Sequence, residues 1–183
     1  RKPSHGLSLV PPKSALWLNW RGERIGPMPL VTGFDTHDLV AQICRQQRAY
    51  SWQLLNRRIA LKELAISGGE FNPAFREKKR LAVARDMVFG NRWPIDEVTR
   101  NCPDFVVADT LPKLVQKMNA LTGAGSVDLA AITEAATCYD ARIDARPRFH
   151  NDEQLRRIEF ARRWIGDRLR TCRFQKILDP KAG

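Results

Sequence analysis

Apolar side chains recur three or four residues apart in the second half of the chain. This spacing places them on one face of a helix. It extends over residues 111–121, 129–143 and 155–165. Side chains that can accept from the free amides of a helix start precede these stretches, at Asp109 and Thr110, at Asp128 and at residues 151–153. The pattern predicts three helices, the first ending near Gly123 and the last rich in arginine.

The first half of the chain begins with a hairpin pattern. Residues 16–20 resemble a strand, and the turn-prone residues 21–24 lead into an extended stretch that reaches Val31. Pro27 and Pro29 have no amide hydrogen to donate to a ladder. We therefore expect the second strand of this hairpin to be short or to lie at a sheet edge.

Between the hairpin and the three helices the pattern is less regular. Residues 70–104 are the least informative, and the charge run at 76–80 is typical of a solvated helix face. The elements that we predict here are a helix beginning at Asp35 or Thr36, a strand over 52–56, a helix over 59–66 and a strand over 105–107. A few strands with segregated helices, and no regular β-α alternation, indicate an α+β fold in one domain.

Composition changes this picture only through charge. The hydrophobic share of 43% and charged share of 28% over 183 residues are those of a globular protein. The formal net charge of +11 makes nucleic acid the first partner to consider. Because the sequence has no zinc finger, heptad zipper or aromatic RNA-binding motif, we do not expect nucleic acid to be the partner.

Several kinds of site are excluded by the motifs that the sequence lacks. No G-x-G-x-x-G or G-x-x-x-x-G-K-[ST] phosphate loop occurs, and G-x-S-x-G and H-E-x-x-H are missing too. The four cysteines are far apart and form no zinc-ligand pair, which favours free thiols and a reducing cytoplasm. No apolar run approaches the roughly 20 residues of a membrane span, so we expect no membrane partner.

Two segments carry a resemblance to a known family. L-N-W-R-G-E-R at residues 18–24 resembles the hairpin by which fumarate reductase-like flavoproteins begin their capping domain. F-V-V-A-D-T-L-P-K-L at residues 105–114 is similar to the start of a later helix of that domain, in fumarate reductases and ketosteroid Δ1-dehydrogenases alike. Tyr139-Asp140 stands where the family often has Tyr-Asn. The chain thus resembles one capping domain over most of residues 7–183, with residues 57–104 as a helical insertion.

The resemblance implies a flavoenzyme whose flavin is held elsewhere. Such enzymes transfer a hydride between the N5 atom of FAD and a carbon next to a carbonyl or carboxylate of a small-molecule substrate. The capping domain closes over the flavin and excludes water. The expected partner is therefore the FAD-binding domain of the same parent chain, and we expect the isolated domain to be inactive.

The resemblance also indicates candidate site residues. Fumarate reductases carry a proton-donating arginine in a Thr-Arg-Asp sequence, and this chain reads Thr36-His37-Asp38 at that place. His37 is the candidate acid or base, with Thr36, Asp38 and Tyr50 as substrate contacts. An imidazole cannot clamp a dicarboxylate as a guanidinium does, so fumarate is a poor substrate candidate. The alternative for His37 is a surface histidine in the first turn of a helix.

Other residues have both a functional and a structural interpretation. Tryptophans 17, 20 and 52 could line a steroid-sized pocket or pack in the core. Arg21 and Arg24 could meet a substrate carboxylate or a flavin phosphate, although solvated hairpin arginines are the simpler expectation. For the whole chain, the alternative to the flavoenzyme is a basic helical module that binds nucleic acid or an acidic partner through the arginines of residues 142–173. A third reading is a capping domain retained purely for interaction or oligomerisation.

Overall fold

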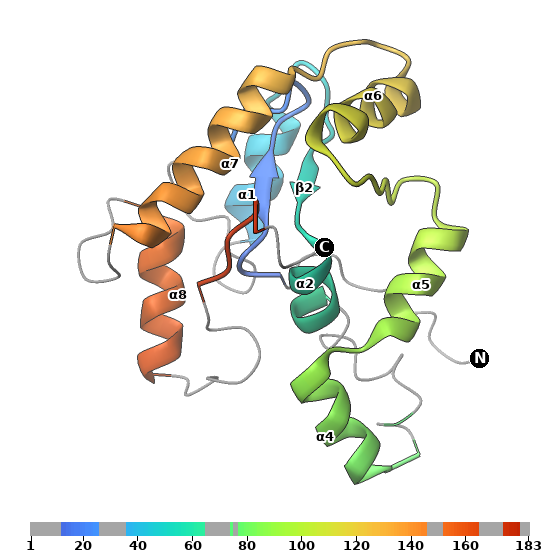
Figure 1. Ribbon diagram of the computed structural model, residues 1–183. Helices are drawn as coiled ribbons and strands as arrows, with labels where there is room; N and C mark the ends of the chain where they lie inside the picture. The colour runs from blue at the N-terminus through green and yellow to red at the C-terminus, as the bar shows by residue number, and fades with distance from the viewer. Residues whose placement is uncertain are drawn as a thin grey trace.

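The computed structural model describes residues 12–25, 36–64, 74, 77–145, 152–164 and 174–179. The elements in these residues are β1 (Leu16–Leu18), α1 (Thr36–Cys44), β2 (Trp52–Leu54), α2 (Arg57–Ile59), the π-helix η1 (Ala60–Leu64), α4 (Arg80–Phe89), α5 (Arg92–Asn101), α6 (Leu111–Thr122), α7 (Leu129–Asp144) and α8 (Glu153–Trp164). A two-stranded sheet lies at the centre, with α7 and α8 on one side and α4 and α5 on the other (Figure 1). The α+β prediction is confirmed.

The core lies between the sheet and the helices α7 and α8. Strands β1 and β2 are antiparallel, with Leu16 opposite Leu54 and Trp17 opposite Gln53. Because side chains alternate along a strand, the leucines share one face of the sheet and Trp17 lies on the other. Each aliphatic side chain buried there stabilises the fold by about 2 kcal/mol. The fully buried members of this cluster are Leu16, Leu18, Ile59, Ile132, Ala136, Tyr139, Leu155 and Ile158.

The turn after β1 packs against α7 and requires a glycine. Gly22 has a φ of +92°, a conformation that side chains with a Cβ atom rarely adopt. A Cβ atom at this position would lie 2.7 Å from Cγ1 of Ile132. The turn is also tied by a backbone hydrogen bond of 2.9 Å from the amide of Asp128 to the carbonyl of Arg21. The start of α7 is therefore fixed against the hairpin turn.

The three helices predicted in the second half are confirmed. Asp128 caps α7 by accepting from the amide of Ala130, and α6 ends at Gly123 in the left-handed conformation. Thr110 occupies the cap position of α6 without a side-chain hydrogen bond. Two details of the prediction are wrong, because Leu121 on the predicted apolar face of α6 is 42% exposed and Leu129 on that of α7 is 36% exposed.

Two of the predicted strands need correction. Residues 105–107 form no ladder. Phe105 packs instead beside Ala60 and Ile95, and the carbonyl oxygen of Val107 accepts a hydrogen bond from Nζ of Lys117. The second arm of the hairpin is reduced, among the described residues, to an isolated bridge between Leu18 and Arg24. Backbone hydrogen bonds from Asn19 to Glu23 and from Ile25 to Trp17 form the start of the predicted hairpin, and β1 also pairs with β2. Residues 26–31 of the predicted arm lie outside the described residues.

The middle of the chain is helical, as expected. The helix predicted over 59–66 begins at Arg57 and continues as a π-helix from Ala60 to Leu64. Helices α4 and α5 occupy residues that gave no clear pattern. The status of residues 57–104 as an insertion stays a prediction. None of the helices in the described ranges is long and apolar enough to cross a membrane.

Candidate functional site

The first turn of α1 carries the predicted acid or base. His37 is exposed, and Asp38, which is half-buried, accepts a hydrogen bond of 2.7 Å from Nε2 of Gln42. This contact holds Asp38 along its own helix, where a carboxylate also interacts favourably with the helix dipole. The backbone of Thr36 begins the helix, but its side chain lies outside the described residues. His37 is thus accessible to a ligand from solution.

Tyr50 lies just before β2 with its ring edge against Trp52, at 5.7 Å between ring centroids. The Tyr50 hydroxyl and the indole nitrogens of Trp17 and Trp52 are buried, and so is Nε2 of Gln53. None of the four has a hydrogen-bond partner among the described residues. Buried polar atoms in proteins are nearly always paired, so each such atom requires an explanation. We call the first turn of α1 together with Tyr50 the α1 face.

Trp20 lies between two guanidinium groups and not in an apolar pocket. The Cζ atom of Arg21 is 4.6 Å from the ring centroid and that of Arg48 is 5.4 Å away. The amide of Trp20 donates to Oε1 of Gln46 over 3.3 Å, which joins the turn to the segment after α1. Cation–π contacts of this kind account for the exposed Arg21 without a ligand. The expectation of a surface arginine is confirmed for Arg21.

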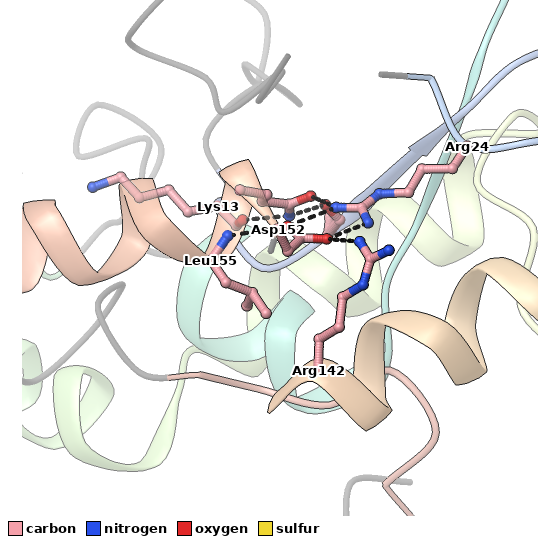
Figure 2. A network of polar contacts seen from close by, with 7 residues as sticks. Lys13, Arg24, Arg142, Asp152 and Leu155 are labelled. Carbon is pink, nitrogen blue, oxygen red and sulfur yellow. Dashed lines mark hydrogen bonds and ion pairs between the residues drawn. The ribbon is translucent and has the colours of Figure 1, made fainter. Parts of the chain in front are cut away.

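Arg24 is the hairpin arginine for which the solvated expectation was wrong. Its guanidinium binds both carboxylate oxygens of Asp152, at 2.6 and 3.2 Å, and also donates to Oε1 of Gln154. Arg142 donates to the same carboxylate over 2.8 Å, and so does the amide of Leu155. Figure 2 shows the two arginines meeting Asp152 from different elements. The ion pair between Arg24 and Asp152 joins the hairpin to the start of α8.

The electrostatics of this network keep Asp152 ionised. Burial favours the neutral acid, but the hydrogen bonds and charge of Arg24, together with Arg142, outweigh it and lower the pKa of Asp152. The Arg24 guanidinium also lies 5.3 Å from the centroid of the fully buried Tyr139 ring. Burial raises the pKa of Tyr139 far above its usual range, and the nearby Arg24 opposes that shift. Tyr139 is therefore neutral and structural.

Glu63 is a second buried carboxyl group, and sequence reasoning missed it. It accepts from the amide of Ser14 at 3.0 Å, the hydroxyl of Ser14 at 2.6 Å and Nε2 of Gln175 at 2.7 Å. Gln154 binds the same segment, because its Nε2 donates to the carbonyl oxygens of Lys13 and Ala15 at 2.8 and 2.9 Å. Burial raises the pKa of Glu63 to about 7, although each of these hydrogen bonds to Glu63 lowers it.

Residues 174–178 are held by two further side chains. Asp140 accepts from the amides of Ile177 and Leu178, at 2.7 and 2.8 Å, and Nδ2 of Asn56 donates to the carbonyl of Lys176. Residues 12–15 and 174–178 therefore lie side by side, with Glu63 bonded to both. We call these two segments, together with the side chains that hold them and the Asp152 network that Arg24 joins to Gln154, the base.

The arginines of α8 are partly matched by acids on the same helix. Arg156 and Arg157 lie within 3.5 Å of the Glu153 carboxylate, and Arg163 lies 2.7 Å from Glu159. Exposed pairs one helical turn apart stabilise a helix only slightly. They nevertheless reduce the charge that this helix offers to a polyanion. That nucleic acid is not the partner stays a prediction.

The described residues offer no cradle for a flavin nucleotide. Gly22 and Gly90 have positive φ, but Ile132 and the backbone of η1 fill the space where their Cβ atoms would stand. A Cβ atom at Gly123 or Gly125 would have no atom of the described structure within 4 Å. Within the described ranges no three His, Cys, Asp or Glu residues are placed to hold a metal ion. The group that the resemblance implies does not fit this part of the chain.

With this geometry established, the chain can be compared with known proteins, and the relatives reported below share one descriptive name. No family model matches the chain, and no solved structure gives a significant match. The chain is 36% identical over 182 residues to a protein of Mycolicibacterium smegmatis named KsdD-like steroid dehydrogenase, covering 99% of this chain and 33% of the relative. Proteins with the same descriptive name from two strains of Mycobacterium tuberculosis are 34% identical over 183 residues, which is 32% of their length.

This chain therefore spans about a third of the length of the curated relatives that it matches. The names agree with the ketosteroid dehydrogenase side of the resemblance.

The sequence contains one local signal for the buried Glu63. Glu63 follows Ile59 by four residues, so the two side chains lie on one helical face, and both are fully buried. An acid on the apolar face of a predicted helix indicates a buried carboxyl group. Which groups donate to it cannot be inferred from this spacing, because Ser14 and Gln175 are distant in sequence.

Proposed function

We propose that this chain is the substrate-side domain of an FAD-dependent, ketosteroid dehydrogenase-like oxidoreductase. The flavin is held by another part of a longer chain, and this domain covers it. The relatives support the kind of enzyme, and the missing flavin cradle is the reason to assign the cofactor to a different part. What this chain supplies is a wall of the substrate cavity and the exclusion of water from it.

The observation that carries the proposal is the base. A domain inserted into another domain must receive and return the chain at neighbouring points. Residues 12–15 and 174–178 meet this requirement, since Ser14 and Gln175 bond to the same Glu63 carboxyl group. Asp140 of α7 holds the segment 174–178, and Gln154 of α8 holds the segment 12–15.

The α1 face is the part of the domain that we assign to the substrate. His37 is exposed, and the Tyr50 hydroxyl is a buried donor without a partner in the described residues. A substrate with a ketone oxygen supplies the acceptor that such a donor lacks. Aromatic surface next to Tyr50, from Trp52, suits a flat apolar molecule. Asp38 and Thr36 flank His37 in this assignment.

An excision experiment tests the proposal. In the longer chain, residues 16–173 are replaced by a short glycine-serine linker, which is possible because the two segments of the base lie side by side. We expect the shortened protein to retain FAD, seen in its absorbance spectrum, and to lose turnover of a 3-ketosteroid with an artificial electron acceptor by at least 100-fold. Unchanged steroid turnover after the excision contradicts the substrate role, and loss of bound FAD contradicts the assignment of the flavin to another part.

A further inference from the structure

Glu63 differs from Asp152 in the kind of partner that it has. Asp152 meets two guanidinium groups, whereas the donors to Glu63 are the hydroxyl of Ser14, the backbone amides of Lys13 and Ser14, and the carboxamide of Gln175. Its side chain is 0% exposed, so water does not compensate for the missing counter-charge. It also lies in a π-helix, a rare element that is found disproportionately at functional sites.

We propose that Glu63 is a proton-operated clasp that joins residues 13–14 to Gln175. With a proton on the carboxyl group the clasp is closed and stable, and loss of the proton to solvent favours its opening. Opening here means that the two segments separate and Glu63 reaches water. The clasp is a property of this chain and does not depend on the proposed enzymatic function, although in a lid it would set how freely the base bends.

The hydrogen bonds can be satisfied in both protonation states. When Glu63 is ionised, the amide and the hydroxyl of Ser14 and Nε2 of Gln175 all donate to it. When Glu63 is protonated, its O–H can donate to the hydroxyl oxygen of Ser14, 2.6 Å away, because a serine hydroxyl both donates and accepts. The Ser14 amide and Gln175 keep donating in either state. The closed form therefore loses no hydrogen bond to Glu63 on taking up a proton, and it avoids a buried charge.

Charged and titratable groups near Glu63 lie on more than one neighbouring element. Helices α4 and α5 pack against η1, and the buried Asp86 of α4 is paired with Arg85 at 3.1 Å. Tyr139 of α7 interacts electrostatically with Glu63, and behind it lie Arg24 and the Asp152 carboxylate. Tyr139 is neutral, and Arg24 is committed to Asp152 at 2.6 Å. The Arg24 and Asp152 charges largely offset one another, so burial remains the main influence on Glu63.

The sign of the effect follows from linkage. Burial raises the pKa of Glu63 from 4.5 to about 7 in the closed form, so the closed form holds the proton more tightly than the open form does. Closing is therefore favoured below about pH 4.5 and weakens as the pH rises towards 7. From pH 5 to pH 8 the ratio of open to closed clasp should rise by roughly 10- to 100-fold.

Amide hydrogen exchange of Ser14 measures the clasp directly, since this amide donates to Glu63. We expect its protection factor, corrected for intrinsic exchange, to fall by roughly 10- to 100-fold between pH 5 and pH 8. Glu63→Gln, which carries no ionisable group, should reduce this change to less than about threefold. Glu134→Gln, at an exposed acid of α7, is the matched control and should leave the change as in the wild type. A wild-type protection factor that stays constant with pH, or a slope that persists in Glu63→Gln, overturns the clasp.

A second measurement does not require the variant to fold. The carboxyl carbon of Glu63 can be followed by ¹³C NMR in the wild-type chain as the pH is changed. A midpoint near 7 supports the clasp, and Ser14→Ala should move that midpoint higher because the hydroxyl hydrogen bond lowers the Glu63 pKa. A midpoint near 4.5, the ordinary value for an exposed glutamate, overturns it.

Discussion

The carboxylates of the base and the polar side chains of the α1 face are paired in opposite ways, although Oε1 of Gln175 in the base is also buried without a partner among the described residues. In the base, the carboxylates of Asp140, Asp152 and Glu63 are largely buried and each accepts two or more hydrogen bonds. At the α1 face, His37 is exposed and the buried Tyr50 hydroxyl lacks a partner within the described residues. Saturated polar groups fix a structure, and unsatisfied ones are available to a ligand. The difference indicates a domain with a firm attachment and a face prepared for a molecule that is not part of it.

The largest effect is expected where the base is densest in charge. Asp152→Ala would leave the Arg24 and Arg142 guanidinium groups facing each other without a counter-ion. Breaking a buried ion pair in this way costs about 3 to 5 kcal/mol, and we expect a loss near the lower figure because Arg142 is about half exposed. Chemical denaturation of the 183-residue chain measures it. A loss below 1 kcal/mol would mean that the network is not what fixes the hairpin to α8.

A smaller loss is expected at the other side of the base. Asp140→Ala removes the acceptor for the amides of Ile177 and Leu178. An unsatisfied buried donor costs about 1 to 3 kcal/mol, so a loss of about 2 kcal/mol is predicted, with faster exchange confined to residues 174–178. Asp144→Ala is a useful control because that exposed carboxylate bonds only a side chain, Lys176, among its described contacts. Equal losses in the two variants would contradict the role of Asp140.

Acid should weaken the base through Asp152. The pKa of Asp152 is held below its usual value of 3.8, so its contribution to stability is present above that value and is lost as the pH falls through the lower, folded-state pKa. We expect unfolding free energies measured from pH 5 to pH 2 to fall less in Asp152→Asn than in the wild type. Parallel pH profiles would contradict the shift.

The smallest effects on stability are expected at the α1 face. His37→Ala and Tyr50→Phe should each change the unfolding free energy by less than about 0.5 kcal/mol, because neither removes a hydrogen bond of the described structure. The same variants placed in the longer chain should lower steroid turnover. If they cost stability and leave turnover unchanged at saturating and limiting substrate, the comparison between the two regions fails.

Local signals in the sequence predicted the helices well and the site only in part. Three signals act within a few residues: the cap at Asp128, the helix end at Gly123 and the apolar spacing within each helix. Helices α6, α7 and α8 could therefore be inferred directly. The pairing of β1 with β2 joins residues more than thirty positions apart and was not predicted, whereas the start of the predicted hairpin is present as the bridge between Leu18 and Arg24. The assignment of Arg24 failed for the same reason, since its partner Asp152 is distant in sequence.

The candidate site shows the same division. The first-turn positions of His37 and Asp38 followed from the cap pattern, and the structure confirms them. The contact of Asp38 with Gln42 is local and could have been anticipated from the four-residue spacing. The hold of Glu63 and Asp140 on residues 174–178 depends on tertiary packing and could not.

Hydrogen exchange of the longer chain, with and without a 3-ketosteroid, tests the central claim most directly. If the domain is a lid, bound steroid should slow exchange in residues 36–44 and 50–54, while residues 12–15 and 174–178 exchange as before. Slowing confined to the base, or no change at the α1 face under conditions where the steroid is bound, would contradict the account.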